Sequence, residues 1–405
     1  MRKQSFLFVF IVLIINSGCR KNPLGTLYLK EDLQQTLDKH LARYTQKFSG
    51  KNIGFGLYVK STGKSHYQNT YVSSGFPKEY GEDIQFRGAS TTKSFTAAAI
   101  LKLRQQNKLN LDDLVTDNIP GTNQPYIPAT DGYAIPYKDK ITIRLLLQHR
   151  AGVFDVSNDA IPDTVNAPYA GQRYFLYMTE KQGEDHTFTF PELINVAAVN
   201  HLSYFEPGAA FHYSNTGYDL LGTIIERISG KRYDQFLQDE FLTPLQMNHT
   251  RFPYLGTDQD IPNPHVTGWL KFENELHELD KENVSIGVSE ANIITTPADL
   301  ATWANALYAT NQILNEELHA QMIAGIPTNE IHGTYGLGCE MHPADIGYGH
   351  NGTRAGYLTT MRYHPGSNTS YILFCNFMDF DEILDQLADM DNIVREAIQA
   401  VEASR

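Results

Sequence analysis

The chain has 405 residues, of which 41% are hydrophobic and 20% charged, so it can bury a large core and is neither disordered nor fibrous. Its formal net charge of −13 argues against a nucleic-acid partner, because nucleic acids are bound by basic surfaces. Length alone would allow two or three domains.

The first residues have the pattern of an export signal. Basic Arg2 and Lys3 precede the apolar run Phe6–Ile15, which is too short to span a bilayer comfortably. Small residues then end in Cys19, as in a bacterial lipoprotein cleavage site, although Asn16 replaces the usual leucine. We therefore expect lipidation of Cys19 and anchoring to a membrane through that lipid. The alternative is an ordinary signal peptide with an incidental cysteine.

The chain divides on this basis into three parts. We expect a signal peptide over 1–18, a lipidated cysteine and tether over 19–29, with residues 22–27 as the plain tether, and a catalytic domain over 30–405. Within that domain, about 110–285 changes character, because loops rich in Pro, Asn, Asp and Tyr alternate there with helical stretches.

The N-terminal part of the domain is predicted to contain a helix, a hairpin and a second helix. Leucines recur at helical spacing within Lys30–Phe48. Ile53–Lys60 and Ser65–Tyr71 are predicted strands, and Ser61–Lys64 between them has turn residues. An alanine- and leucine-rich helix is predicted over Thr91–Gln106.

The remaining elements follow from proline, glycine and periodicity signals. The predicted helices are Pro191–His201, Thr216–Ser229 closed by Gly230, Pro297–Tyr308 capped by Thr295 or Thr296, and Asp381–Ala400. The predicted strands are Thr334–Cys339, Tyr348–Gly349, Leu358–His364 and Tyr371–Phe377. Strands thus occupy both ends of the chain and helices its middle. We expect an α/β fold with an antiparallel sheet built from both chain ends, flanked by helices, and a mostly helical lobe inserted.

The first chemical signal is Ser-x-x-Lys, which occurs twice. Ser61 and Lys64 lie in a predicted turn, where nothing would hold the lysine against the serine. Ser90 and Lys93 lie at a helix start, where a spacing of three places both side chains on one face. A serine becomes a good nucleophile when a base takes its proton, and a lysine of lowered pKa can do so. A simple N-cap is the alternative role for Ser90.

Two further short motifs each have a second copy elsewhere. Tyr213-Ser214-Asn215 follows Pro207-Gly208, whereas Tyr67-Gln68-Asn69 lies inside a predicted strand. His350-Asn351-Gly352 ends a short strand, whereas His364-Pro365-Gly366 is typical of a turn. No single motif is therefore specific. The order of the motifs along the chain and the secondary structure predicted around each of them indicate the function.

In this order the motifs resemble those of the penicillin-recognising serine hydrolases, which include class C β-lactamases, D-alanyl-D-alanine carboxypeptidases and related esterases and D-peptidases. The similarity covers nearly all of the chain after the signal segment. Its matching segments are Phe86–Lys93, Lys108–Asp113, Ile141–Gly152, Pro207–Tyr218, Thr295–Leu300, Tyr335–Gly338 and Gly349–Gly352. Asn107 stands where that family usually has glycine, and Arg150-Ala151 replace Thr-Ser. The resemblance implies a serine β-lactamase-like fold.

The resemblance also implies roles for the motif residues. Ser90 attacks a carbonyl and forms an acyl-enzyme. Lys93 and Tyr213 share the general base and acid work. Asn215 holds Lys93 and the substrate amide, and His350 faces Ser90 from the edge strand.

The segment after His350 is expected to bind substrate through Asn351, Gly352 and Thr353. The backbone N–H groups of Ser90 and Thr353 would form the oxyanion hole. Arg354 would either hold a substrate carboxylate or be a solvated arginine. His149 is expected to be structural, packing the helical lobe.

The third motif bears on the substrate. Class C β-lactamases usually carry Lys-Thr-Gly, whereas this chain carries His350-Asn351-Gly352, as the peptidase and esterase branches do. We therefore expect a D-alanyl-D-alanine carboxypeptidase or related D-peptidase acting on cell-wall peptides, located in the periplasm or at the outer membrane. A β-lactamase or esterase acting on β-lactams or esters, and a non-turnover penicillin-binding sensor, are the alternatives.

No metal or other cofactor is expected, because the histidines are scattered and there is no H-E-x-x-H or P-loop motif. Cys339 and Cys375 have no metal-type spacing. They are interpreted as small buried residues on strands, with a single bridge between them as the alternative.

Overall fold

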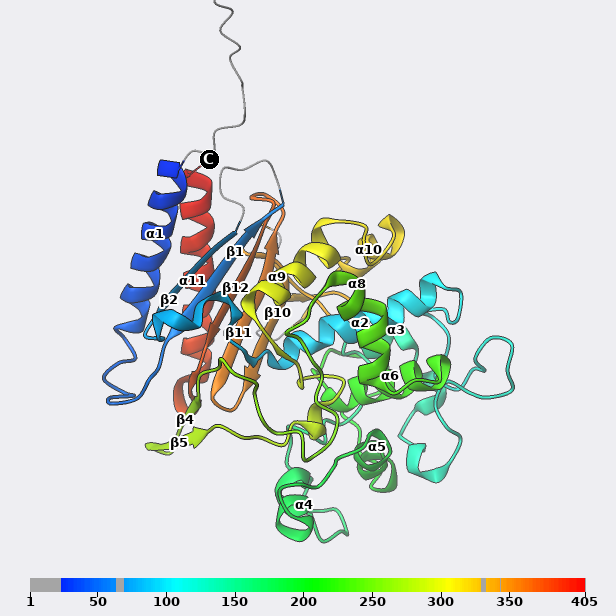
Figure 1. Cartoon of the computed structure of the whole chain (residues 1–405). Helices are drawn as coiled ribbons and strands as arrows, with labels where there is room; N and C mark the ends of the chain where they lie inside the picture. The colour runs from blue at the N-terminus through cyan, green and yellow to red at the C-terminus, as the bar shows by residue number, and fades with distance from the viewer. Residues whose placement is uncertain (1–22, 63–68, 329–332, 343, 405) are drawn as a thin grey trace, which may run out of the picture.

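The computed structural model of the chain describes residues 23–62, 69–328, 333–342 and 344–404 (Figure 1). The predicted signal peptide and Cys19 lie outside the described residues, as do Gly63 and Lys64 of the predicted turn and the start of the second predicted strand, residues 65–68. Within the described ranges, no helix is long and apolar enough to cross a membrane.

The main sheet is antiparallel and joins the two ends of the chain. In the part of the chain that the structure describes, its strand order is β2-β1-β12-β11-β10-β9-β8-β7. Strand β1 pairs with β12 so that Phe55 lies opposite Cys375, which confirms the predicted sheet. The strands are β1 Phe55–Ser61, β2 Asn69–Ser74, β7 Ile326–Pro327, β8 Thr334–Tyr335, β9 Glu340–His342, β10 Gly347–Arg354, β11 Tyr357–His364 and β12 Thr369–Cys375.

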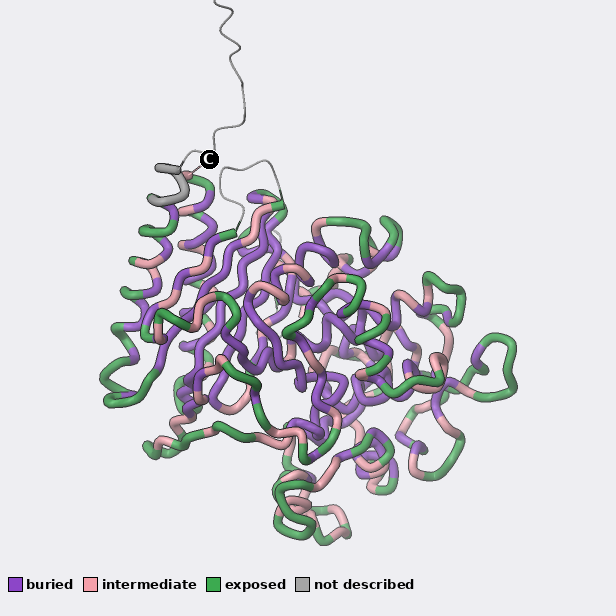
Figure 2. Tube along the Cα trace, viewed as in Figure 1, coloured by how far each residue is buried: buried purple, intermediate pink, exposed green. Residues whose placement is uncertain are grey.

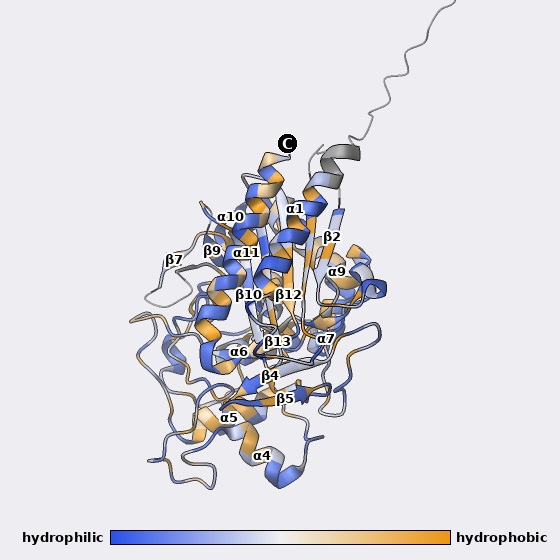
Figure 3. Ribbon diagram, turned by 90° about the vertical axis from the view of Figure 1, so that its left-hand side faces the viewer, coloured by the Kyte–Doolittle hydropathy of each residue, from blue (hydrophilic) through white to orange (hydrophobic). Residues whose placement is uncertain are grey.

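One face of the sheet is covered by the first and last helices, α1 (Pro23–Leu41) and α11 (Ile383–Ala403), which lie side by side (Figure 3). Their apolar stripes form a core with β1, β11 and β12. Helix α1 begins at Pro23 and not at Lys30, so residues predicted as a tether are helical. It ends at Leu41, earlier than predicted, where turns bring Tyr44 and Phe48 against Phe377.

Other helices cover the opposite face and build the lobe (Figure 1). Helix α2 is buried along nearly its whole length and forms the centre of the larger core (Figure 2). The predicted C-terminal end of α6 and start of α9 are confirmed, since Gly230 closes α6 at a φ of 67° and Thr296 caps α9. The helix predicted to run to Tyr308 changes after Ala304 into a π-helix over Asn305–Ala309. These helices are α2 Thr92–Gln105, α3 Ile143–Leu147, α4 Tyr174–Gln182, α5 Phe190–Val199, α6 Asn215–Ser229, α7 Tyr233–Leu237, α8 Thr243–Leu245, α9 Pro297–Ala304 and α10 Glu316–Met322.

The middle of the chain is less purely helical than predicted. It ends in a hairpin of β4 (Gly268–Phe272) and β5 (Glu275–Leu279), and β13 (Phe377–Asp379) pairs in parallel with β4. Glu273 and Asn274 both have positive φ, 49° and 65°, as a two-residue hairpin turn requires. Because this turn lacks the usual glycine, the sequence did not indicate it.

Only the first two residues of the strand predicted over Thr334–Cys339 form a strand, β8, and β9 begins just after the predicted range. Strands β8 and β9 are separated by a loop in which Gly338 has a φ of 66°. A Cβ on Gly338 would lie 2.5 Å from the Ala97 side chain, so this loop packs directly on α2. Cys339 therefore lies outside a strand, while Cys375 ends β12, and both thiols are buried and free.

Candidate active site

The serine of the second Ser-x-x-Lys motif lies at the start of α2. The two-stranded ladder of β3 (Phe86–Arg87) and β6 (Ile294–Thr295) leads into a 3₁₀ turn over Ala89–Thr91, which runs directly into α2. Ala89 has a φ of 49°, a conformation that costs a residue with a Cβ about 1–3 kcal/mol. Ser90 is partly exposed, whereas its neighbours on both sides are buried.

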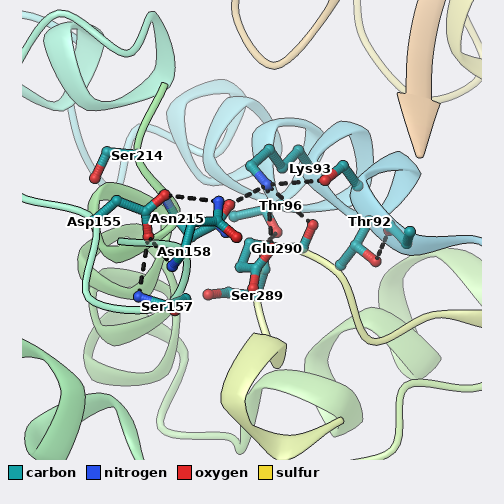
Figure 4. A network of polar contacts seen from close by, with 12 residues as sticks. Thr92, Lys93, Thr96, Asp155, Ser157, Asn158, Ser214, Asn215, Ser289 and Glu290 are labelled. Atoms are coloured by element: carbon teal, nitrogen blue, oxygen red, sulfur yellow. Dashed lines mark hydrogen bonds and ion pairs between the residues drawn. The ribbon is translucent and has the colours of Figure 1, made fainter. Parts of the chain in front are cut away.

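Lys93, one turn along α2, is completely buried and points toward Asn215 and Glu290 (Figure 4). Its Nζ donates hydrogen bonds to Ser90 Oγ at 3.3 Å and to Asn215 Oδ1 at 2.7 Å. Burial lowers the pKa of this ammonium group, although three carboxylates nearby oppose the shift. A lysine in this state is suited to accept a proton from the serine.

The second motif places its residues at the N-terminus of α6. Ser214 caps the helix by accepting a hydrogen bond from the Gly217 N–H, and Asn215 is the first helical residue. His149 accepts the N–H of Ser214 through Nδ1, and its ring stacks on Tyr213 with centroids 4.1 Å apart. His149 therefore packs inside the lobe as predicted, and it packs directly against a site residue.

Tyr213 lies beside both the serine and the lysine. Lys93 Nζ is 4.5 Å from the centre of its ring, a cation–π contact. Desolvation raises the pKa of the Tyr213 phenol well above its ordinary value, and a hydrogen bond with Ser90 opposes that rise. The phenol is therefore protonated at neutral pH and can donate a hydrogen bond or a proton.

The third motif lies on β10, beside the nucleophile turn. His350 is buried, with Nδ1 2.5 Å from the Asn351 carbonyl oxygen and Nε2 2.9 Å from the Tyr335 hydroxyl. Since a carbonyl only accepts, Nδ1 carries a proton in this arrangement, and a neutral ring accepts the Tyr335 proton at Nε2. The His350 and Tyr213 ring centres are 6.2 Å apart.

The residues after His350 bring β10 close to the serine turn. A Cβ on Gly352 would lie 2.3 Å from the Gly88 carbonyl oxygen, so only glycine permits this approach. The Asn351 N–H donates to Glu340 Oε2 at 3.1 Å, and Thr353 is exposed. The structure thus brings the predicted substrate segment beside the turn that carries Ser90.

Arg354 has neither of the two roles predicted for it. Its Nε is 2.9 Å from Glu282 Oε1, and its Nη2 donates to the Asn283 carbonyl at 3.4 Å. Only 11% of its side chain is exposed, so it is not a solvated arginine. Because Glu282 already binds its guanidinium, Arg354 does not offer an open site for a substrate carboxylate.

Sequence reasoning missed three buried carboxylates that surround Lys93. Glu290 approaches Lys93 Nζ most closely, with Oε2 at 3.3 Å and its carbonyl oxygen at 3.2 Å. Asp155 accepts the Asn215 N–H at 3.1 Å (Figure 4). Asp219 accepts the Ser289 hydroxyl at 3.1 Å. Glu290 and Asp155 are only 2% exposed. A signal existed for Glu290, because an acid inside the apolar stretch 286–294 needs a buried partner.

Burial favours the neutral form of the Asp155 and Asp219 carboxyl groups. It raises the pKa of Asp155 to about 6, against hydrogen bonds from backbone N–H groups that favour the carboxylate. It raises the pKa of Asp219 well above its ordinary value, and Glu290 adds to that rise. Across the described ranges, no group of three or more His, Cys, Asp or Glu could hold a metal ion.

The comparison with protein families agrees with this geometry. The sequence model of the family described as Beta-lactamase matches residues 33–391, which is most of the chain. The chain belongs to the Beta-lactamase family of serine hydrolases. The match includes every residue that was predicted to act in catalysis.

Curated relatives in the Beta-lactamase family are similar over part of their length. Protein flp of Staphylococcus aureus (strain MW2) is 31% identical over 278 residues, which are 68% of this chain and 49% of that protein. A probable hydrolase clz13 of Cochliobolus lunatus is 28% identical over 252 residues, 55% of this chain and 38% of that protein. The chain therefore spans about half the length of the curated relatives it matches first.

Solved structures share the whole fold. A D-stereospecific amidohydrolase from Streptomyces sp. is 25% identical with a TM-score of 0.68, covering 86% of this chain and 94% of that one. The D-amino acid amidase from Ochrobactrum anthropi SV3 is 24% identical with a TM-score of 0.72, covering 93% and 99%. A penicillin binding protein from Bacillus halodurans is 20% identical with a TM-score of 0.64, covering 90% and 99%.

Proposed function

We propose that this member of the Beta-lactamase family hydrolyses small amides or peptides of D-amino acids through an acyl-enzyme on Ser90. One observation carries the proposal. Lys93 Nζ is fully buried and lies 3.3 Å from Ser90 Oγ, and burial lowers the pKa of the group, which favours the neutral amine. A lysine buried in this way is poised to act as a base toward the Ser90 hydroxyl.

The proposed reaction has two stages. Ser90 Oγ attacks the substrate carbonyl carbon while its proton passes to the neutral amine of Lys93, and the oxyanion faces the N–H groups of Ser90 and Thr353. The C–N bond then breaks as the leaving amine takes a proton from the Tyr213 hydroxyl, which Lys93 reprotonates. In the second stage, water gives a proton to the same pair and attacks the ester carbon, releasing the acid and restoring Ser90.

Two observations support amide substrates of D-configuration. The Streptomyces amidohydrolase and the Ochrobactrum amidase, both named for D-specific amide chemistry, match nearly the whole chain. A D-alanyl-D-alanine carboxypeptidase is the narrower form of the proposal, and it requires a cation for the substrate's free carboxylate. Since Arg354 is bound by Glu282, we favour substrates whose C-terminal group is an amide or a further residue.

A substrate panel tests the proposal. D- and L-phenylalanine amide, a D-alanyl-D-alanine peptide, nitrocefin and p-nitrophenyl acetate are compared on wild type and the Ser90→Ala variant. We expect faster release of ammonia from the D-amide than from the L-amide, and loss of all activities in Ser90→Ala. Rapid nitrocefin or ester hydrolysis without D-amide turnover would identify a β-lactamase or esterase instead. Stoichiometric labelling by a fluorescent penicillin, with no turnover of any substrate, would identify a sensor.

We further propose that the protein is exported and held at a membrane, in the periplasm or at the outer membrane, by a lipid on Cys19. The support is the sequence pattern of Arg2, Lys3 and the apolar run Phe6–Ile15 before that cysteine. Cys19→Ala should convert the protein from a membrane-bound to a freely soluble exported form. Unchanged membrane association in a cell fractionation assay would refute this.

A further inference from the structure

The lysine of the site is held by an acid that no motif includes. Glu290 lies in the loop before β6, and both its carbonyl oxygen and its carboxylate contact Lys93 Nζ, at 3.2 Å and 3.3 Å. Both side chains are removed from water, with Lys93 0% and Glu290 3% exposed. A charge pair this deeply buried persists when its geometry is well supported, because desolvation opposes each charge.

Charged groups of alternating sign lie behind Glu290. Glu290 and Arg354 both lie next to Gly287. A Cβ on this glycine would lie 2.7 Å from Glu290 Oε1 and 3.1 Å from Arg354 Nη1. Arg354 binds Glu282 at 2.9 Å, and Glu282 is 3.5 Å from the Nε of buried Arg87. The series therefore runs from Lys93 to a residue three positions before Ser90, and it includes the end of β10.

We propose that Glu290 is a positioning residue of the hydrolytic site, which holds Lys93 against Ser90. This inference rests on the serine-hydrolase chemistry proposed above, and Arg354 enters it as a nearby positive charge that opposes the charge of Glu290. Glu290, through its carboxylate and its carbonyl oxygen, and Asn215 accept hydrogen bonds from Lys93 Nζ, and so hold the nitrogen 3.3 Å from Ser90 Oγ, where the neutral amine can accept the serine proton.

Glu290 also controls the charge on Lys93. Besides Glu290, the groups that face this ammonium are the carboxylates of Asp155 and Asp219 and the rings of Tyr213 and Tyr218. Glu290 is the largest of the influences that favour the charged form. Removing its charge would let Lys93 lose its proton at lower pH.

The test is a pH profile of the glutamine variant. The rate at which a fluorophosphonate probe phosphonylates Ser90, with loss of fluoride, is measured from pH 4 to pH 10 in wild type and Glu290→Gln. One limb of the plot of rate against pH reflects the deprotonation of Lys93. We expect this limb to move to lower pH by about one unit or more in Glu290→Gln, because the neighbouring negative charge is gone. A fluorophosphonate does not depend on the true substrate, so failure of the D-amide proposal would leave this measurement intact.

A second variant should move this limb of the pH profile in the opposite direction. Arg354→Gln removes a positive charge beside the pair, so the same limb should move to higher pH. Glu226→Gln serves as the control, because Glu226 is a half-buried acid on α6 that binds Tyr233 and Tyr254, remote from Lys93. Unmoved limbs in both site variants, or shifts in the same direction, would overturn the proposal. If Glu290→Gln fails to fold, Arg354→Gln alone decides by the direction of its shift.

Discussion

Asn215 Oδ1 accepts a 2.7 Å hydrogen bond from Lys93 Nζ, and this contact joins the two helices that meet at the active site. Lys93 comes from α2 in the core, and Asn215 begins α6 in the lobe. Asn215 is fixed in turn by its own N–H, which donates to buried Asp155. The position of the base therefore depends on how the lobe packs on α2.

Removing this contact should weaken catalysis more than folding. In Asn215→Ala, Lys93 loses a partner worth about 1.5–3 kcal/mol, because the bond involves a charged donor. We expect kcat/KM to fall roughly 10- to 100-fold, measured with whichever panel substrate is turned over. Asn200→Ala is the control, since Asn200 makes two amide hydrogen bonds at the end of α5, away from the site. Equal effects of the two variants would contradict this reading.

The Tyr213 hydroxyl can be tested without disturbing its ring. Tyr213→Phe keeps the stacking on His149 and the cation–π contact with Lys93 but removes the proton donor. We expect acylation to slow about 10²- to 10⁴-fold, the range for a lost general acid or base, with little change in Tm. The exposed Tyr137→Phe should keep the wild-type rate. A Tyr213→Phe rate within a few-fold of wild type would remove Tyr213 from the mechanism.

Gly352 should tolerate no side chain. A Cβ there would meet the Gly88 carbonyl at 2.3 Å, so Gly352→Ala must push β10 away from the serine turn. We expect both a lower Tm and loss of most activity. In contrast, a Cβ on Gly217 has no neighbour closer than 3.6 Å, and Gly217→Ala should be stable because alanine favours helix by about 0.5–1 kcal/mol. Normal activity in Gly352→Ala would show that the close approach is dispensable.

Asp155 should make the fold less stable as the pH rises. Burial raises its pKa from 3.8 to about 6, so the folded state favours the neutral acid. The penalty for ionisation is absent below about pH 4, grows between pH 4 and pH 6, and is complete above pH 6. It amounts to something on the order of 2–3 kcal/mol. Asp155→Asn should flatten this part of the pH dependence of the free energy of unfolding, measured with urea at pH 4 and pH 7.

The control for that experiment is Asp131→Asn at an exposed position, which should reproduce the wild-type slope. An Asp155→Asn protein with the wild-type slope would mean that Asp155 does not carry the penalty. The absolute stability of Asp155→Asn is expected to fall, because an amide cannot replace the carboxylate that accepts the N–H groups of Ser157, Asn158 and Asn215.

The features predicted correctly from sequence are those with local signals. The cap at Thr296, the glycine after Ser229 and the leucine stripe of α1 each act within a few residues, so the helices were found. Asn107, where the family usually has glycine, has a φ of 58° and so takes the left-handed conformation that glycine adopts easily. The order of the motifs identified the family, and the strands predicted at both ends of the chain indicated the sheet.

The features that were missed depend on contacts between distant segments. Glu290 contacts Lys93 only because the loop before β6 folds back over α2, and nothing around residue 290 specifies that partner. Arg354 was predicted in isolation, without Glu282, which lies on another segment. The hairpin of β4 and β5 was missed because its turn has Glu273 and Asn274 in place of glycine.

The pairing of β1 with β12 has a consequence for the timing of folding. Strand β1 is among the first elements to be synthesised, yet its neighbour in the sheet is among the last. Loop closure over such a separation is entropically costly and slow, so the sheet cannot close until nearly the whole chain has left the ribosome. Ser90 and Lys93 are therefore made long before His350 is available to join them. A prematurely terminated chain would carry the nucleophile without an assembled site.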